Sequence, residues 1–397
     1  MIVTMRSTTI SRCCTLAVLL LTAPPLSGQE TVEITTDDRF LEADFEELYR
    51  VGSMQGDGWD VFGRVGEVAF DGSGNLYVLD TQAARFSVVD LDGNLLRQFG
   101  GLGEGPGEFG GATSSAISFA VLHDGRITAF DPSRRHFVIF SPEGEFERQT
   151  RLAASAWVII PALQAESGSA AVVSTGEVGY LGSAPDSDGP PLRHVMRYGL
   201  TSDEASVDTV AAVWAPSEDL EFAPRLSVGV LPDGGVAFVD SSAYAVKVTG
   251  PAGGVSRVLS RPFAAVPVTE TMRAGHLERE LEDLDAMGNR GNATEQAMAD
   301  FLRAELESAE FYHEVPLVRN LRTSPEGTIW VRRSGPEPGN NGPIDLITAD
   351  GRYLGSFASD ATNLPSAFGP DGLVAFVRSN DLDVQTVVVS RLPQGIR

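Results

Sequence analysis

The sequence predicts an all-β fold, a six-bladed β-propeller with a short helical insertion between blades 4 and 5. Three observations support this prediction. A pattern of strand, turn and strand recurs along most of the chain, 42 glycines and 23 prolines are scattered through it, and a single region has apolar residues at helical spacing. A chain with 42% apolar residues and this many turn formers has the composition of a turn-rich globular β protein.

The recurring unit is an apolar segment, a turn containing Asp-Gly or Glu-Gly, and an alternating strand. In the first copy the strand is closed by Asp80. The copies span residues 68–80, 120–131, 228–240, 321–331 and 367–377. The last two copies lack the closing acid. Internal repetition of this kind is the signature of an array of similar structural units.

Most copies are followed by a second predicted hairpin. Residues 86–99 alternate apolar and polar side chains around Asp92 and Gly93, and Asp-Gly is a strong hairpin signal. Residues 137–150 match this pattern. Each unit is thus predicted to contain four antiparallel strands, a to d, over roughly 35 to 50 residues, which is the period of propeller blades. One such sheet cannot bury both faces alone, so we expect the sheets to pack side by side in a ring.

Counting the units predicts six blades and a closed ring. Five units have a first strand near residues 66, 116, 226, 319 and 366, and residues 162–214 supply a degenerate sixth. The last unit ends before its fourth strand, whereas residues 45–52 have the form of a fourth strand with no preceding three. We expect this segment to complete the last blade, which would join the two ends of the ring. The alternative is a strand that packs elsewhere.

The first unit resembles one complete NHL repeat. The matching segments are residues 66–71, 75–80, 85–90, 95–100 and 105–109. The resemblance spans most of residues 45–392 and becomes less specific in the later blades, which retain mainly the turns. It implies an exported bacterial six-bladed propeller. Propellers similar to this one include calcium-dependent lactonases and esterases and zinc-dependent lyases.

The N-terminus has the features of a secretory signal peptide. Arg6 and Arg12 precede a short apolar run and a small-residue segment that ends at Gly28. A signal anchor is the alternative. We expect a secreted or periplasmic protein with no transmembrane segment in the mature chain, and with no cysteine, because Cys13 and Cys14 both lie in the leader. The predicted divisions are a leader at 1–28, an extension at 29–44, the propeller at 45–392 and a tail at 393–397.

The charge balance limits the partners that this chain is expected to bind. It has 30 Lys and Arg against 54 Asp and Glu, a net charge of -24. Nucleic acid is excluded as an expected partner, because its binding depends on neutralising phosphates with basic groups. The partner is then an unknown protein or small-molecule ligand. An acidic surface also has a plainer explanation, namely solubility through mutual repulsion, and a cation or a basic partner is the other interpretation.

Residues 268–313 interrupt the repeats and are predicted to form two amphipathic helices. The apolar positions are Leu277, Leu281, Leu284, Met298, Phe301, Leu302 and Leu306. Asn292 and Glu295 have the form of a capping box for the second helix. The insert should lie over or beside one mouth of the channel, as a structural cap or as a lid or docking element.

A binding site is expected on the face that carries the loops joining strands b and c. Loops held on a rigid scaffold are free to vary in chemistry, and arginines there would bind carboxylate or sulfate through paired hydrogen bonds. The candidate ligand-binding residues are Asp80, Arg85, Asp131, Arg134, Arg135, His136, Asp240, Tyr244, Arg333 and Arg378. The structural alternative is that each Asp caps its own turn and each Arg pairs with a neighbouring blade.

Catalytic signatures are weaker. The five histidines form no close ligand pair, and a zinc site needs three or four converging ligands. A calcium site built from Asp and Asn oxygens of separate blades stays open, and no other cofactor is expected. Residues 100–107 are glycine-dense but lack the Lys and Ser or Thr of a phosphate-binding loop. We therefore predict a ligand-binding or protein-interaction scaffold, with a calcium- or zinc-dependent hydrolase or lyase at the channel as the alternative.

Overall fold

The computed structural model describes residues 29–54, 58–110, 116–153, 157–175, 179–181, 193–214, 220–290, 293–380 and 382–396. The predicted leader 1–28, Asn292 of the predicted capping box, and Arg397 lie outside the described residues. Neither described helix has the combination of length and apolar character that a membrane span requires.

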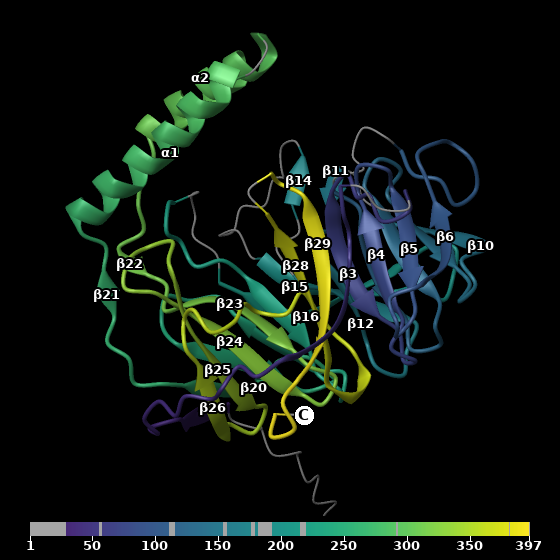
Figure 1. The fold of residues 1–397 in the computed structure, drawn as a ribbon. Helices are drawn as coiled ribbons and strands as arrows, with labels where there is room; N and C mark the ends of the chain where they lie inside the picture. Colours follow the sequence, from purple (N-terminus) through teal and green to yellow (C-terminus); the bar gives the residue numbers. More distant parts are fainter. Residues whose placement is uncertain are drawn as a thin grey trace, which may run out of the picture.

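Six four-stranded antiparallel sheets follow one another around a ring (Figure 1), which confirms the predicted fold class. Blade 1 consists of β3 (Val65–Phe70), β4 (Leu76–Asp80), β5 (Arg85–Val89) and β6 (Leu95–Gly100). Blade 2 consists of β7 (Ser118–Val121), β8 (Ile127–Asp131), β9 (His136–Phe140) and β10 (Phe146–Arg151). Blade 3 consists of β12 (Leu163–Ala165), β13 (Ala171–Ser174), β15 (Arg193–Gly199) and β16 (Ser206–Val213).

The remaining blades have the same strand order, with the N-terminal strands added. Blade 4 consists of β17 (Ser227–Val230), β18 (Val236–Val239), β19 (Ala245–Thr249) and β20 (Val255–Ser260), with β1 (Glu30–Glu33) at its edge. Blade 5 consists of β23 (Val318–Thr323), β24 (Thr328–Ser334), β25 (Asn341–Thr348) and β26 (Tyr353–Phe357). Blade 6 consists of β27 (Ala367–Phe368), β28 (Leu373–Ser379), β29 (Gln385–Arg391) and β2 (Glu46–Val51).

The insert lies between blades 4 and 5, as predicted. It contains α1 (Glu270–Arg290) and α2 (Ala293–Glu307), flanked by the short strands β21 (Val266–Pro267) and β22 (Glu314–Val315). A further antiparallel strand pair consists of β11 (Trp157–Ile159) and β14 (Gly179–Leu181). In the sequence, β11 precedes blade 3, and β14 falls between its second and third strands. Figure 1 shows the two helices as a pair that projects to one side of the ring. Two of the predicted apolar positions, Met298 and Phe301, remain 52% and 58% exposed.

The core is divided among the interfaces between blades. Six apolar clusters occur among the described residues, and each joins two neighbouring sheets. Strand β4 shows why, because alternate side chains of a strand point to opposite faces. Leu76 and Val78 pack toward blade 6, whereas Tyr77 and Leu79 pack toward blade 2. Each sheet thus buries both faces only when it has a neighbour on each side, as the repeat pattern predicted.

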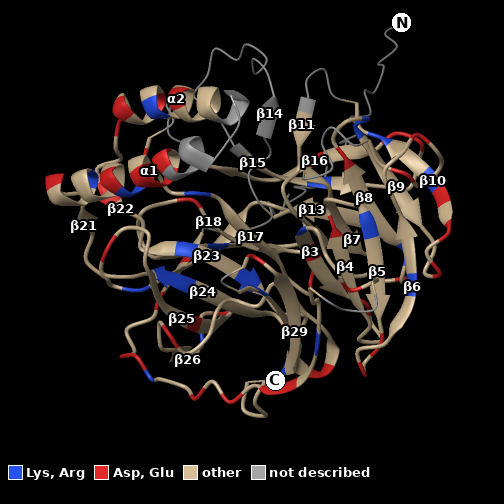
Figure 2. Ribbon diagram, turned by 45° about the horizontal axis from the view of Figure 1, so that its top comes forward, with Lys and Arg blue, Asp and Glu red and all other residues tan. Residues whose placement is uncertain are grey.

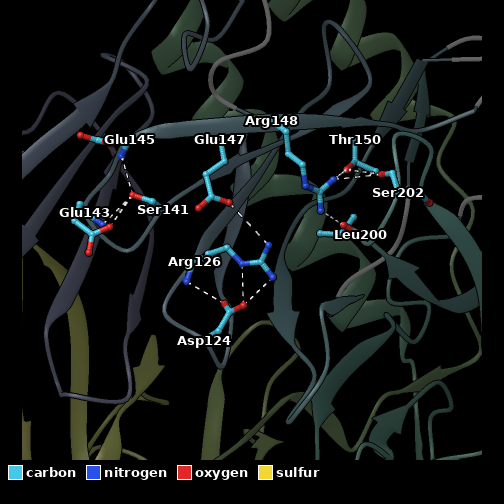
Figure 3. Close-up of polar contacts among 10 residues, drawn as sticks. All are labelled: Asp124, Arg126, Ser141, Glu143, Glu145, Glu147, Arg148, Thr150, Leu200 and Ser202. Atoms are coloured by element: carbon cyan, nitrogen blue, oxygen red, sulfur yellow. Dashed lines mark hydrogen bonds and ion pairs between the residues drawn. The ribbon is translucent and has the colours of Figure 1, made fainter.

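Turn chemistry sets the hairpins. In blade 1 Asp71 accepts hydrogen bonds from the N–H groups of Ser73 and Asn75, at 2.8 and 2.9 Å. Ser141 plays this part in blade 2, where it accepts from the N–H groups of Glu143 and Glu145 (Figure 3). N–H groups in a tight turn often lack a backbone acceptor, and an Asp or Ser side-chain oxygen accepts their hydrogen bonds instead. This is why Asp and Ser recur at these positions.

The ring is closed by the N-terminal segment. Strand β2 pairs antiparallel with β29, so residues 45–52 complete blade 6 as predicted. The preceding segment adds contacts that the sequence did not indicate. Strand β1 pairs in parallel with β20 of blade 4, and Phe40 then bridges to Ser356 of blade 5. We call residues 30–41 the strap, because this part of the predicted extension crosses blades 4 and 5 before the chain enters blade 6.

Candidate functional site

The two ends of the ring differ in what they present. At the end that we call the loop face, strands b end and strands c begin, as at Asp80 and Arg85. The opposite end, the turn face, carries the turns that join strand a to b and c to d, such as Asp71 to Asn75. All ten predicted site residues lie at or near the loop face, on blades 1, 2, 4, 5 and 6.

Three predicted acids on the loop face bind backbone. Asp80 accepts hydrogen bonds from the N–H groups of Gly63 and Arg64, at 3.0 and 3.1 Å. Asp131 accepts from the N–H of Gly110 at 3.2 Å. In each case the donors precede strand a of the same blade, so the acid that closes strand b anchors the connection arriving from the previous blade.

Asp240 repeats this contact in blade 4. It accepts a hydrogen bond from the N–H of Trp214 at 2.9 Å and forms an ion pair with Lys247 at 2.7 Å. Asp240 and Asp131 are almost completely buried. The recurrence of one contact in three blades gives these carboxylates a structural role, since each is already engaged by backbone N–H groups and Asp240 also by Lys247.

The predicted basic residues of blades 1, 2 and 6 have separate environments. Arg134 donates to the carbonyl oxygens of Gly103 and Glu108, each at 2.6 Å, and thereby holds the connection between blades 1 and 2. Arg135 has a positive φ of 57°. Arg85 and His136 begin strand c of blades 1 and 2 and are half-buried, and the exposed Arg378 lies 5.8 Å from the ring centre of Phe376.

Arg333 and Tyr244 belong instead to a buried charge network between blades 4 and 5. The fully buried Asp345 pairs with Arg261 at 2.9 Å and lies 3.4 Å from Arg333. Asp38 of the strap bridges the same two arginines, at 2.9 Å from Arg261 and 2.6 Å from Arg333. The hydroxyl of Ser356 donates to Asp345 at 2.5 Å. Two guanidinium groups thus face two carboxylates.

Aromatic rings enclose this network. The ring centre of Phe263 lies 4.8 Å from the guanidinium carbon of Arg261 and 5.0 Å from that of Arg333. Such cation–π contacts stabilise desolvated arginines. The buried Tyr244 packs edge-on against Phe263, and burial together with the Asp345 carboxylate raises the pKa of its phenol well above the ordinary value. The network therefore joins the strap to blades 4 and 5.

A cavity of about 340 Å³ occupies the channel and opens toward the turn face. Its lining comes from the inner strands of all six blades, which include β3, β7, β12, β17, β23 and β27. The strands contribute four polar side chains to the lining, Glu67, Gln164, Arg322 and Thr323, and His123 from the a–b turn of blade 2 also lines the cavity. This volume falls in the range of small-molecule sites in proteins.

Glu67 links three blades from inside the channel. Its Oε2 accepts a hydrogen bond from the N–H of Phe119 in blade 2 at 2.8 Å, and the N–H of Leu163 in blade 3 also faces the carboxyl. Burial raises the pKa of this carboxyl to about 8, although both N–H groups and the charge of Arg322 act in the opposite direction. Glu67 is therefore largely uncharged at neutral pH, because desolvation disfavours the ionised form.

Arg322 lines the same cavity from blade 5 and has a different environment. Its guanidinium makes no hydrogen bond or ion pair with any residue that the structure describes. Gln164 is already engaged, because its Oε1 accepts from the N–H of Val230 at 2.9 Å. Asp71 and Glu166 also line the cavity, but Asp71 accepts hydrogen bonds within its own turn and Glu166 pairs with Arg197 at 2.7 Å. Among the arginines and acids of the lining, Arg322 is therefore the one without a hydrogen bond or ion pair to a described residue. Figure 2 shows further basic residues on β23 and β24, in contrast to the acidic helices.

Our sequence reasoning missed Glu67 and Arg322, because it searched the loops and treated strand a as core. For Glu67 the sequence did contain a signal. Glu67 is the single charge in the otherwise apolar residues 65–70, whereas residues 318–323 also contain Arg319, Asn320 and Thr323, so Arg322 did not stand out. Within the described parts of the chain, no three His, Cys, Asp or Glu side chains gather where they would hold a metal ion.

Comparisons with known proteins support the fold. No protein family model matches the chain, and no curated protein matches it in sequence. A solved structure of a protein described as exported, from Bacteroides fragilis, is 13% identical, with 92% of this chain and 99% of that chain covered and a TM-score of 0.50. A member of the duf4221 family from Bacteroides vulgatus is 10% identical, with 88% and 98% covered and a TM-score of 0.52. Membership of the NHL-repeat family is not shown, so that resemblance stays a prediction.

Proposed function

We propose that this chain is an exported six-bladed propeller that binds a small anionic molecule in its channel cavity. One observation carries the proposal: Arg322 lines a cavity of ligand size and makes no ion pair or hydrogen bond with any described residue. A guanidinium donates paired hydrogen bonds that match a carboxylate or sulfate. Export rests on the predicted leader at residues 1–28 and on the description of the Bacteroides fragilis protein.

Glu67 gives the proposed site its second feature. As a neutral acid it adds no negative charge to the cavity, and its O–H is able to donate a hydrogen bond to a bound anion. Once the carboxyl ionises above its pKa of about 8, it repels the same ligand. We therefore expect affinity for an anion to fall as the pH rises past 8.

The proposal is tested by calorimetric titration of the mature chain with carboxylates of two to eight carbon atoms. Arg322→Ala should weaken binding at least about tenfold, because a charge-assisted pair is lost. Arg279→Ala, a change on an exposed position of α1, is the matched control and should bind as the unmodified chain does. Glu67→Gln should remove the fall in affinity above pH 8. Equal binding by Arg322→Ala would contradict the proposal.

The binding proposed here uses no metal ion. We therefore expect calcium, zinc and a chelator each to leave the melting temperature unchanged. A rise with calcium that the chelator reverses would instead favour a metal-dependent hydrolase or lyase, since a ligand that binds the folded state stabilises it.

A further inference from the structure

A second cavity lies on the loop face, at the seam where blade 6 meets blade 1. Its volume is about 520 Å³, and it is separate in its lining from the channel cavity. The side chains that matter here are Arg64, Gln82, Ser379, Asp383 and Gln385. Two of them come from the b–c connections of blades 1 and 6, so the cavity exists only because the ring is closed.

Two opposite charges line this seam cavity without pairing. The side chains of Arg64 and Asp383 are both exposed, and neither makes an ion pair or hydrogen bond with a residue that the structure describes. Their backbones are nevertheless held. The N–H of Arg64 donates to Asp80 at 3.1 Å, and the N–H of Asp383 donates to the carbonyl of Asn380 at 3.0 Å. Fixed backbones with unpaired charged groups are what a preorganised ligand site requires.

Neutral donors lie between the two charges. Gln385 uses its Oε1 to accept the N–H of Val65 at 2.6 Å, so its amide N–H₂ remains available. Gln82 lies against Gly63, where an added Cβ would come within 2.2 Å of the Gln82 Oε1. Because Gly63 has no side chain, the amide of Gln82 can occupy this space. Ser379 adds a hydroxyl.

We propose that the seam cavity binds a small zwitterion, namely a free α-amino acid or a dipeptide. Arg64 receives the carboxylate through paired hydrogen bonds, Asp383 receives the ammonium, and the amides bind the remaining polar atoms. A zwitterion also suits the charge of this protein, because a chain with a net charge of -24 repels a simple anion at an exposed site, whereas a molecule without net charge is not repelled.

The test compares three ligands that differ by one charge. Alanine has both groups, N-acetylalanine lacks the ammonium, and alaninamide lacks the carboxylate. Titrations use the Arg322→Ala background, so that binding in the channel does not contribute. We expect alanine to bind, and each singly charged analogue to bind at least about tenfold more weakly.

Two substitutions assign the charges. Arg64→Met should lower the affinity for alanine to that for alaninamide, and Asp383→Asn should lower it to that for N-acetylalanine. Asparagine tolerates the positive φ of 57° at this position, so the fold should persist. Arg279→Met serves as the control and should leave all three affinities unchanged. The proposal is overturned if alanine shows no binding up to about 10 mM, or if either analogue binds as tightly as alanine.

Discussion

Two sets of charges lie inside this propeller, and they differ in pairing. Between blades 4 and 5, Arg261 and Arg333 face Asp345 and Asp38 at 2.6 to 3.4 Å. In the channel, Glu67 is bound by backbone and Arg322 by no described residue. Paired buried charges hold segments together, whereas an unpaired charge beside a cavity is free to bind a ligand. Two of the predicted ligand-binding residues belong to the paired kind. Arg333 pairs with Asp38, and Asp131 accepts a hydrogen bond from the N–H of Gly110, so both hold the fold together.

The largest expected effect comes from breaking the paired set at its centre. Asp345→Asn should lower the free energy of unfolding by about 3–5 kcal/mol, because it leaves two buried guanidinium groups with one carboxylate. Guanidinium chloride unfolding of both proteins measures the difference. Asp44→Asn, on an exposed acid, is the control and should stay within about 0.5 kcal/mol. A comparable loss in both variants would show that the network does not stabilise the fold.

The channel residue Glu67 should make the free energy of unfolding depend on pH. Burial raises the pKa of Glu67 from 4.5 to about 8, so between these values the unfolded chain has released a proton that the folded chain still holds. The contribution of Glu67 to stability is thus complete below pH 4.5 and is lost as the pH rises toward 8. Relative to Glu67→Gln, stability should fall by about 1.4 kcal/mol per pH unit in this window. Parallel stability curves for the two proteins would refute the assignment.

Asp38 should behave in the opposite sense and more weakly. Burial raises the pKa of this carboxyl, but Arg333 and Arg261 lower it further, so the net shift is downward. Its stabilisation is present above about pH 4 and disappears as the pH falls through the lowered pKa. Asp38→Asn should cost about 1 kcal/mol at pH 7, because solvent partly screens the pair. The difference between the two proteins should vanish once the pH lies below the lowered pKa of Asp38, and a loss that persists in acid would point to packing instead.

The smallest effect is expected at the surface. Arg126 pairs with Asp124 at 2.7 Å on the exposed turn that joins β7 to β8 in blade 2, with side chains 26% and 52% exposed (Figure 3). Arg126→Ala should change stability by less than about 1 kcal/mol, since exposed pairs gain little. Thermal unfolding at low and high salt checks this. A larger loss of stability would mean that an exposed ion pair contributes as much as a buried one, so that burial does not distinguish the two kinds of pair.

Several parts of this architecture could be predicted from local pattern. The copies at residues 68–80 and 120–131 became blades 1 and 2, and residues 45–52 became the closing strand β2. Period-two alternation and turn residues carry that information, because both are properties of neighbouring residues. The strap was missed, since residues 30–33 hold a parallel pairing with β20 that nothing nearby in the sequence indicates.

The sequence by itself determined the repeated four-stranded unit, the number of units and the acid that ends strand b, because each depends on spacing within a few tens of residues. Only the tertiary structure decided which charges meet. Glu67 and Arg322 are 255 positions apart in the numbering and share one cavity, and Asp38 of the strap pairs with Arg333, 295 positions away. Such pairings depend on how the blades pack around the channel, and the ligand site that we propose lies where this packing leaves Arg322 without an ion-pair partner among the described residues.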